Sequence, residues 1–145
     1  MAFERHNGSL TLTTDRQRIS LDDVEAFLRQ TYWASQRSRD RIARTLETSL
    51  CFAVVDESTG TTVAFARVVT DYADFAWLCD VFVTPERRGE GISSWMLESM
   101  LSHPDLQGLR RMILATSDAH GLYAQHGFTA LANPQLWMER GPKPR

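Results

Sequence analysis

Two glycines lie between a predicted strand and a predicted helix, at a place where the chain could bind an anion. The apolar, β-branched run 76–83 predicts a buried strand, which must end before Pro85 because proline has no N–H to give to a sheet. Gly89 and Gly91 follow, and a helical pattern begins at Ile92. Glycines let a backbone approach a ligand closely, and the free N–H groups of a first helical turn point towards it. The spacing therefore predicts a phosphate-binding turn.

Two arginines, Arg87 and Arg88, add positive charge at the same place. Their side chains reach either a phosphate or only water, and backbone N–H groups alone are enough to hold a pyrophosphate. The alternative is a plain turn into a helix, with solvated arginines.

Asp80 is a candidate for proton transfer because it lies inside the apolar strand. Strict alternation places it on the same face as Leu78 and Phe82, and desolvation there raises the pKa of a carboxyl towards a value useful for a general base. Arg67 is likewise a charged residue inside an apolar strand, the one that precedes. A hairpin about residues 72–74 puts Arg67 and Asp80 nearly opposite each other. Asp80 is therefore either a base or a structural residue, in a buried ion pair or bracing a bulge. An Arg67 partner would lower its pKa.

Two segments resemble motifs of the GNAT superfamily of N-acetyltransferases. The family signature Arg/Gln-x-x-Gly-x-Gly/Ala falls on Arg88, Gly91 and Ser93, with a serine at the last place. Downstream, Leu122-Tyr123-Ala-Gln-His-Gly127-Phe128 is similar to the family's Leu-Tyr-x-x-x-Gly-Phe motif. The resemblance covers about residues 50–130, and the first 48 residues match only in their strand–helix–helix outline.

The resemblance implies an N-acetyltransferase that moves an acetyl group from acetyl-CoA to an amine by direct attack in a ternary complex. It places the CoA pyrophosphate on the backbone of residues 88–93. It places the pantetheine arm and the reacting oxygen on strand 80–83, where a bulge would free N–H groups. The cofactor-binding residues that it implies are Val81, Phe82, Val83, Arg87, Arg88, Gly89, Glu90, Gly91, Ile92, Ser93 and Tyr123.

Tyr123 resembles the family's general acid, which protonates the leaving thiolate. A phenol has a pKa of about 10 and a thiol of about 8.5, so this transfer is uphill by roughly 2 kcal/mol. Positioning the sulfur, or packing in the core, are the alternative roles. His120 is a candidate base or acceptor contact near the thioester. Asp118 is expected to be the N-cap or a first-turn acid of the short helix that contains His120 and Tyr123. Thr116 stands where the family often has asparagine.

Acceptor recognition in this family usually comes from the first two helices and the loop between them. Tyr32 and Trp33 could wall an acceptor pocket, and Arg67 completes the expected substrate-binding set. Aromatic packing above a solvated basic turn is the alternative.

Charge leaves the acceptor open between small-molecule and peptide amines. Arg37 or Arg39 could hold an acceptor carboxylate, whereas Asp71 and Asp74 in a hairpin loop would attract a cationic amine.

The remaining patterns predict an α/β (mixed α+β) domain with a GNAT-like central mixed, splayed sheet flanked by helices. An antiparallel meander precedes a strand–helix–strand step, which makes part of the sheet parallel. A single domain over residues 1–140 and a solvated tail over 141–145 are expected. Strands are predicted at 10–14, 50–55, 62–70, 75–83 and 111–115, with one or two more within 128–138. Helices are predicted after Ser20, at 40–47, from Ile92 to near Pro104, and at 119–126.

Composition argues against several other classes. A length of 145 residues fits one domain, and a net charge of −2 gives no basic field for nucleic acid. No apolar run is long enough for a membrane span, and the first residues lack a signal core. Cys51 and Cys79 lie in apolar runs and are expected to be reduced, which favours the cytoplasm.

No metal is expected, because His6, His103 and His126 lack ligand spacing. A monomer or homodimer is expected. The alternative function is that of a non-catalytic acyl-CoA-binding or sensor module of the same fold.

Overall fold

The computed structural model describes residues 2–141, and the chain divides into two compact units, residues 1–115 and 116–145. The single domain expected over residues 1–140 therefore remains a prediction. Of the expected tail, Gly141 is exposed, and residues 142–145 lie outside the described residues.

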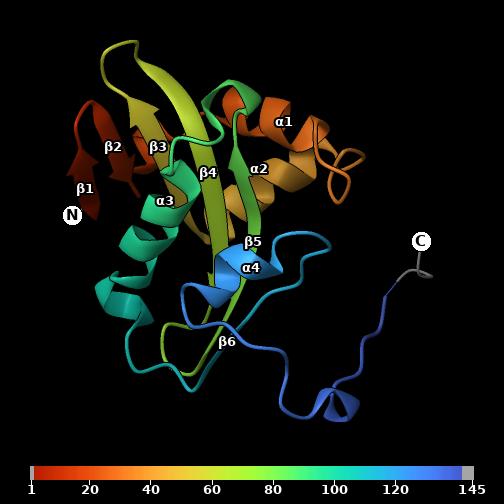
Figure 1. The fold of residues 1–145 in the computed structure, drawn as a ribbon. Helices are drawn as coiled ribbons and strands as arrows, with labels where there is room; N and C mark the ends of the chain where they lie inside the picture. Colours follow the sequence, from red (N-terminus) through yellow and green to blue (C-terminus); the bar gives the residue numbers. More distant parts are fainter. Residues whose placement is uncertain (1, 142–145) are drawn as a thin grey trace. The chain divides into compact units, whose positions relative to one another are not determined.

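The first unit is built on a six-stranded mixed sheet whose strands lie in chain order (Figure 1). The strands are β1 (Glu4–Asn7), β2 (Leu10–Thr13), β3 (Leu50–Asp56), β4 (Thr61–Thr70), β5 (Phe75–Val83) and β6 (Arg111–Ile113). Neighbours are antiparallel from β1 to β5, and β5 is parallel to β6 because helix α3 (Ile92–Leu101) crosses between them. The predicted mixed α+β sheet is confirmed.

Helices α1 (Leu21–Arg29) and α2 (Arg39–Thr48) cover one face of this sheet, and α3 lies on the other (Figure 1). The predicted start of α1 is confirmed, since the Ser20 hydroxyl accepts the Asp23 N–H. The rings of Phe27 and Phe82 stack with centroids 4.9 Å apart, which fixes α1 against β5. The buried cluster on this face consists of Val24, Phe27, Leu28, Ala34, Ile42, Cys51, Phe65 and Phe82.

The sheet opens between β5 and β6. Their pairing joins Phe75–Trp77 to Arg111–Ile113 and ends there, although β5 continues to Val83. The predicted splay is thus present, and residues 78–83 of β5 run along the opening.

The described part of the second unit, residues 116–141, contains one short helix, α4 (His120–Ala124), and a 3-10 turn at Pro134–Leu136. The prediction of one or two strands within residues 128–138 is wrong, because residues 128–141 form no strand. Pro134 cannot donate to a sheet. Over residues 2–141, no helix has both the length and the apolar character needed to cross a membrane.

Candidate active site

The turn after β5 has the backbone geometry predicted for anion binding. Gly89 and Gly91 have φ values of 83° and 82°, in the left-handed region that glycine adopts without a Cβ clash. Gly91 immediately precedes α3, and no side chain caps that helix. The first i to i−4 hydrogen bond of α3 runs from the Trp95 N–H to the Gly91 carbonyl at 3.1 Å. The backbone N–H groups before Trp95 therefore point out of the N-terminal end of the helix. This cradle suits an anion such as the CoA pyrophosphate.

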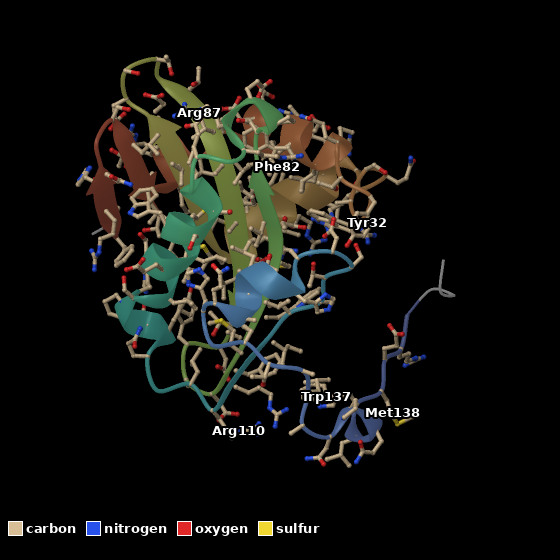
Figure 2. The ribbon with its side chains drawn as sticks, in the orientation of Figure 1. Tyr32, Phe82, Arg87, Arg110, Trp137 and Met138 are labelled. Carbon is tan, nitrogen blue, oxygen red and sulfur yellow. The ribbon has the colours of Figure 1, made fainter. Side chains whose placement is uncertain are left out.

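The two arginines brace this turn with their side chains. Arg87 Nη1 lies 2.8 Å from Asp56 Oδ2, and its Nε lies 3.0 Å from Glu90 Oε1. Hydrogen bonds from Ser58 and from Arg87 lower the pKa of Asp56 to about 2. Figure 2 shows Arg87 beside the turn.

Arg88 Nε donates to the Val83 carbonyl at 3.0 Å, and its guanidinium carbon lies 5.4 Å from the centroid of the Phe82 ring. Both arginines are therefore engaged within the first unit, which leaves the glycine backbone as the best-placed anion donor.

A bulge interrupts β5 at Asp80. Phe65 pairs with Phe82 while Arg67 pairs with Cys79, so Asp80 and Val81 together face the single residue Ala66. Asp80 has φ 54°, which is uncommon for a residue with a side chain. The bulge expected within residues 80–83 is thus placed at 80–81, where the ladder of backbone bonds is disrupted.

Three donors surround the Asp80 carboxylate. Arg37 Nη1 lies 2.7 Å and Arg67 Nε 2.9 Å from Oδ2, and the indole Nε1 of Trp33 lies 3.0 Å from Oδ1. Burial alone would raise the pKa of Asp80, but the hydrogen bonds and charges of the two arginines outweigh it and lower the pKa. The rise expected for a general base is therefore contradicted, and the buried ion pair with Arg67 is confirmed.

The loop between α1 and α2 supplies two of these donors. The sequence predicts that Trp33 lines an acceptor pocket and that Arg37 or Arg39 holds an acceptor carboxylate. It does not predict the contacts of Trp33 and Arg37 with Asp80. Tyr32 is 60% exposed, and its ring stands edge-on to that of Trp33 at 5.0 Å (Figure 2). Arg39 is paired elsewhere, with Asp22 and Glu25.

The remaining catalytic candidates belong to the second unit. Tyr123 is buried, and its ring meets that of Phe128 edge-on at 5.9 Å. His120 is the exposed first residue of α4. The expected Asp118 cap is wrong, because the Thr116 hydroxyl instead accepts the N–H groups of Asp118 and Ala119. The hydroxyl of Thr116, two and three residues before these N–H groups, thus takes the capping role that was expected of Asp118.

A cavity of about 590 Å³ in the first unit lies between the start of α1, the end of α2 and the start of β3. None of the predicted site residues lines it. Among the described residues, no group of three or more His, Cys, Asp or Glu side chains is arranged to hold a metal ion.

Residues 16–128 match the model of the acetyltransferase (GNAT) family. The chain belongs to the GNAT family. A presumed acetyltransferase of Gibberella zeae is 29% identical to this GNAT chain, and the match covers 93% of this chain and 91% of the relative. The crystal structure of a presumed GNAT acetyltransferase from Xanthomonas campestris pv. campestris has 47% identity and a TM-score of 0.87, covering 91% of this chain and 92% of that one.

A more distant GNAT-like structure is N-acetylglutamate synthase from Neisseria gonorrhoeae, solved with coenzyme A and N-acetyl-glutamate. It has 16% identity and a TM-score of 0.66, and the match covers 83% of this chain and 28% of that one. This likeness shows the fold alone.

Proposed function

We propose that this GNAT protein is an acetyl-CoA-dependent N-acetyltransferase that acts on an amine of a small molecule or peptide. The observation that carries the proposal is the uncapped start of α3 behind two left-handed glycines, directly after a bulged strand that borders the opening of the sheet. A structure with the same fold was solved with coenzyme A, which supports the cofactor.

The backbone of residues 88–93 would hold the CoA pyrophosphate, and α3 would contribute its positive helix end. Val81, Phe82 and Val83 would bind the pantetheine arm along the opened part of β5. The side chains of Arg87 and Glu90 would keep the turn in place through their ion pair.

In the proposed reaction, a neutral amine attacks the thioester carbonyl in a ternary complex. Backbone N–H groups freed by the bulge stabilise the oxyanion, and the bond to sulfur breaks to release the thiolate. Tyr123, on the strength of its motif, donates a hydrogen bond or a proton to that thiolate. The amine's proton passes to water, since the lowered pKa of Asp80 makes it a weak base. His120 is the alternative acceptor of that proton.

We further propose a cytoplasmic monomer or homodimer. The two cysteines, Cys51 and Cys79, are both free thiols, as expected in a reducing compartment.

A non-catalytic acyl-CoA-binding module is the alternative, and the tyrosine of the second motif argues against it because a pure binder needs no group at the sulfur. Release of CoA from acetyl-CoA in the presence of an amine panel, together with acetyl-CoA affinity by calorimetry, tests the proposal. Binding with amine-dependent CoA release supports the enzyme. Binding without release on any amine would favour the module, and absence of binding would contradict both.

A further inference from the structure

The cluster around Asp80 carries more positive than negative charge. Among residues 2–141, two arginines, Arg37 and Arg67, pair with this one aspartate, which leaves a net charge of +1. Burial raises the pKa of Cys51 to about 12 and that of Cys79 to about 11, so these neighbouring thiols are neutral and do not offset the excess. A net charge in a mostly desolvated place is costly unless an ion of opposite sign joins it.

The excess charge is reachable from solvent at Arg37. Its side chain is 19% exposed, whereas those of Arg67 and Asp80 are 8% and 1% exposed. One N–H of the Arg37 guanidinium reaches Asp80, and among residues 2–141 no second side chain or carbonyl accepts a hydrogen bond from it. A guanidinium has five N–H donors in a planar fork, so most of this fork is available to a ligand.

The aromatic pair Tyr32 and Trp33 belongs to the same loop. Trp33 is half-buried and donates to the other oxygen of Asp80, and Tyr32 stands edge-on to it. Asp80 accepts from Arg37, Arg67 and Trp33 together, so it has little capacity left to attract a cationic amine.

We infer that this cluster selects an acceptor amine that also carries an oxyanion group, a carboxylate or a phosphate, which the guanidinium of Arg37 binds. The inference rests on the proposed function, and it decides between the two charge cues in the sequence: the loop arginine, not the hairpin aspartates, recognises the acceptor.

Turnover gives the first test. CoA release is measured with β-alanine, O-phosphoethanolamine, β-alaninamide and 1,3-diaminopropane, with rates compared per concentration of neutral amine. We expect kcat/KM to be about 10- to 100-fold higher for the carboxylate or the phosphate, as for one hydrogen bond to a charged group. The first two compounds separate the two oxyanions. Faster turnover of the amide or the diamine would overturn the inference and leave the acetyltransferase proposal intact.

Binding gives a second test that needs no turnover. The ¹⁵N indole signal of Trp33, identified with Trp33→Phe, is titrated in the CoA-bound protein with N-acetyl-β-alanine and with its primary amide. We expect an affinity at least about tenfold higher for the carboxylate. Equal affinities would overturn the inference whether or not the protein turns over, and absence of CoA release would count against the proposed function alone.

Variants assign the effect to Arg37. Arg37→Gln is expected to bring the carboxylate affinity down to that of the amide, and Arg37→Lys to keep part of the difference because the charge remains. Arg41→Gln, the matched control on the exposed side of α2, removes the same charge and should leave the difference unchanged. An unaltered preference in Arg37→Gln would contradict the assignment. If that variant does not fold, the comparison of the two ligands on the parent protein still decides.

Discussion

The Nε atom of Arg67 lies 2.9 Å from Oδ2 of Asp80, at a bulge where the Asp80 backbone is left-handed. The same oxygen accepts Arg37, and the other oxygen accepts Trp33. One carboxylate therefore joins the loop after α1 to two strands of the sheet. This arrangement ties the expected acceptor side of the protein to the bulge.

Asp80→Asn should destabilise the fold because it leaves two arginines with a neutral partner. We expect the free energy of unfolding, measured in urea, to fall by about 3–5 kcal/mol. Arg67→Met should cost less, because Arg37 and Trp33 still donate to Asp80. Asp74→Asn, which breaks the exposed pair with Arg110 (labelled in Figure 2), is the control and should cost less than about 1 kcal/mol. A stable Asp80→Asn protein that lost the alkaline-rising limb of its rate–pH profile would instead identify Asp80 as the base.

Gly91→Ala should weaken acetyl-CoA binding while the fold persists. The new Cβ meets no atom within 4 Å, so the cost within the protein is the strain of a left-handed alanine, about 1–2 kcal/mol. Gly60→Ala is matched to it, with φ 72° and equally open surroundings in the β3–β4 turn. Calorimetry should show reduced affinity in the first variant alone. Equal affinities in the two variants would remove the cofactor from this turn.

Tyr123→Phe should slow turnover with little change in acetyl-CoA affinity. The expected decrease in kcat is about 100-fold or less, at the low end for general acid catalysis, because thiolate leaves readily. Tyr72→Phe, an exposed tyrosine of the β4–β5 hairpin, is the control for loss of a hydroxyl. A kcat equal to that of the parent protein would exclude Tyr123 from the reaction.

Asp56 should make stability depend on acid pH. Its folded pKa of about 2 lies below the unfolded value of about 3.9, so its stabilisation is complete above about pH 4 and is lost as the pH falls towards 2. Asp56→Asn should be less stable than the parent at pH 7, and the difference should vanish between pH 4 and 2. Ser58→Ala should show a smaller version of the same profile. A difference that persisted unchanged to pH 2 would contradict this assignment.

The sequence predicts the part of the fold whose patterns are local. The cap at Ser20, the glycine turn and the strands β3 to β5 were found because apolar alternation and helix-start residues mark them directly. Strand β1 was missed because Glu4–Asn7 is polar, and it is held by pairing with β2 rather than by burial. The prediction of strands within 128–138 was wrong for the opposite reason. This segment contains apolar residues, but it pairs with no neighbouring strand in the structure.

The candidate site is less accessible to sequence reasoning because it depends on long-range contacts. The Arg67–Asp80 pair was predictable from a hairpin, whose register fixes which residues face each other. The contact between Trp33 and Asp80 spans 47 residues and depends on how the loop after α1 folds back on the sheet. The one sequence signal for this contact is the combination of an aromatic and basic loop with a lone acid in an apolar strand, since the acid needs a donor when it is buried.

The surroundings of the two cysteines, Cys51 buried and Cys79 half-buried, also determine how the protein can be assayed. With pKa values of about 12 for Cys51 and about 11 for Cys79, almost none of either thiol is ionised at pH 8. Aromatic disulfide reagents react with the thiolate, so they should label these side chains slowly while they detect the released CoA. Continuous measurement of acetyl transfer is therefore feasible on the unmodified chain, without prior alkylation or cysteine replacement.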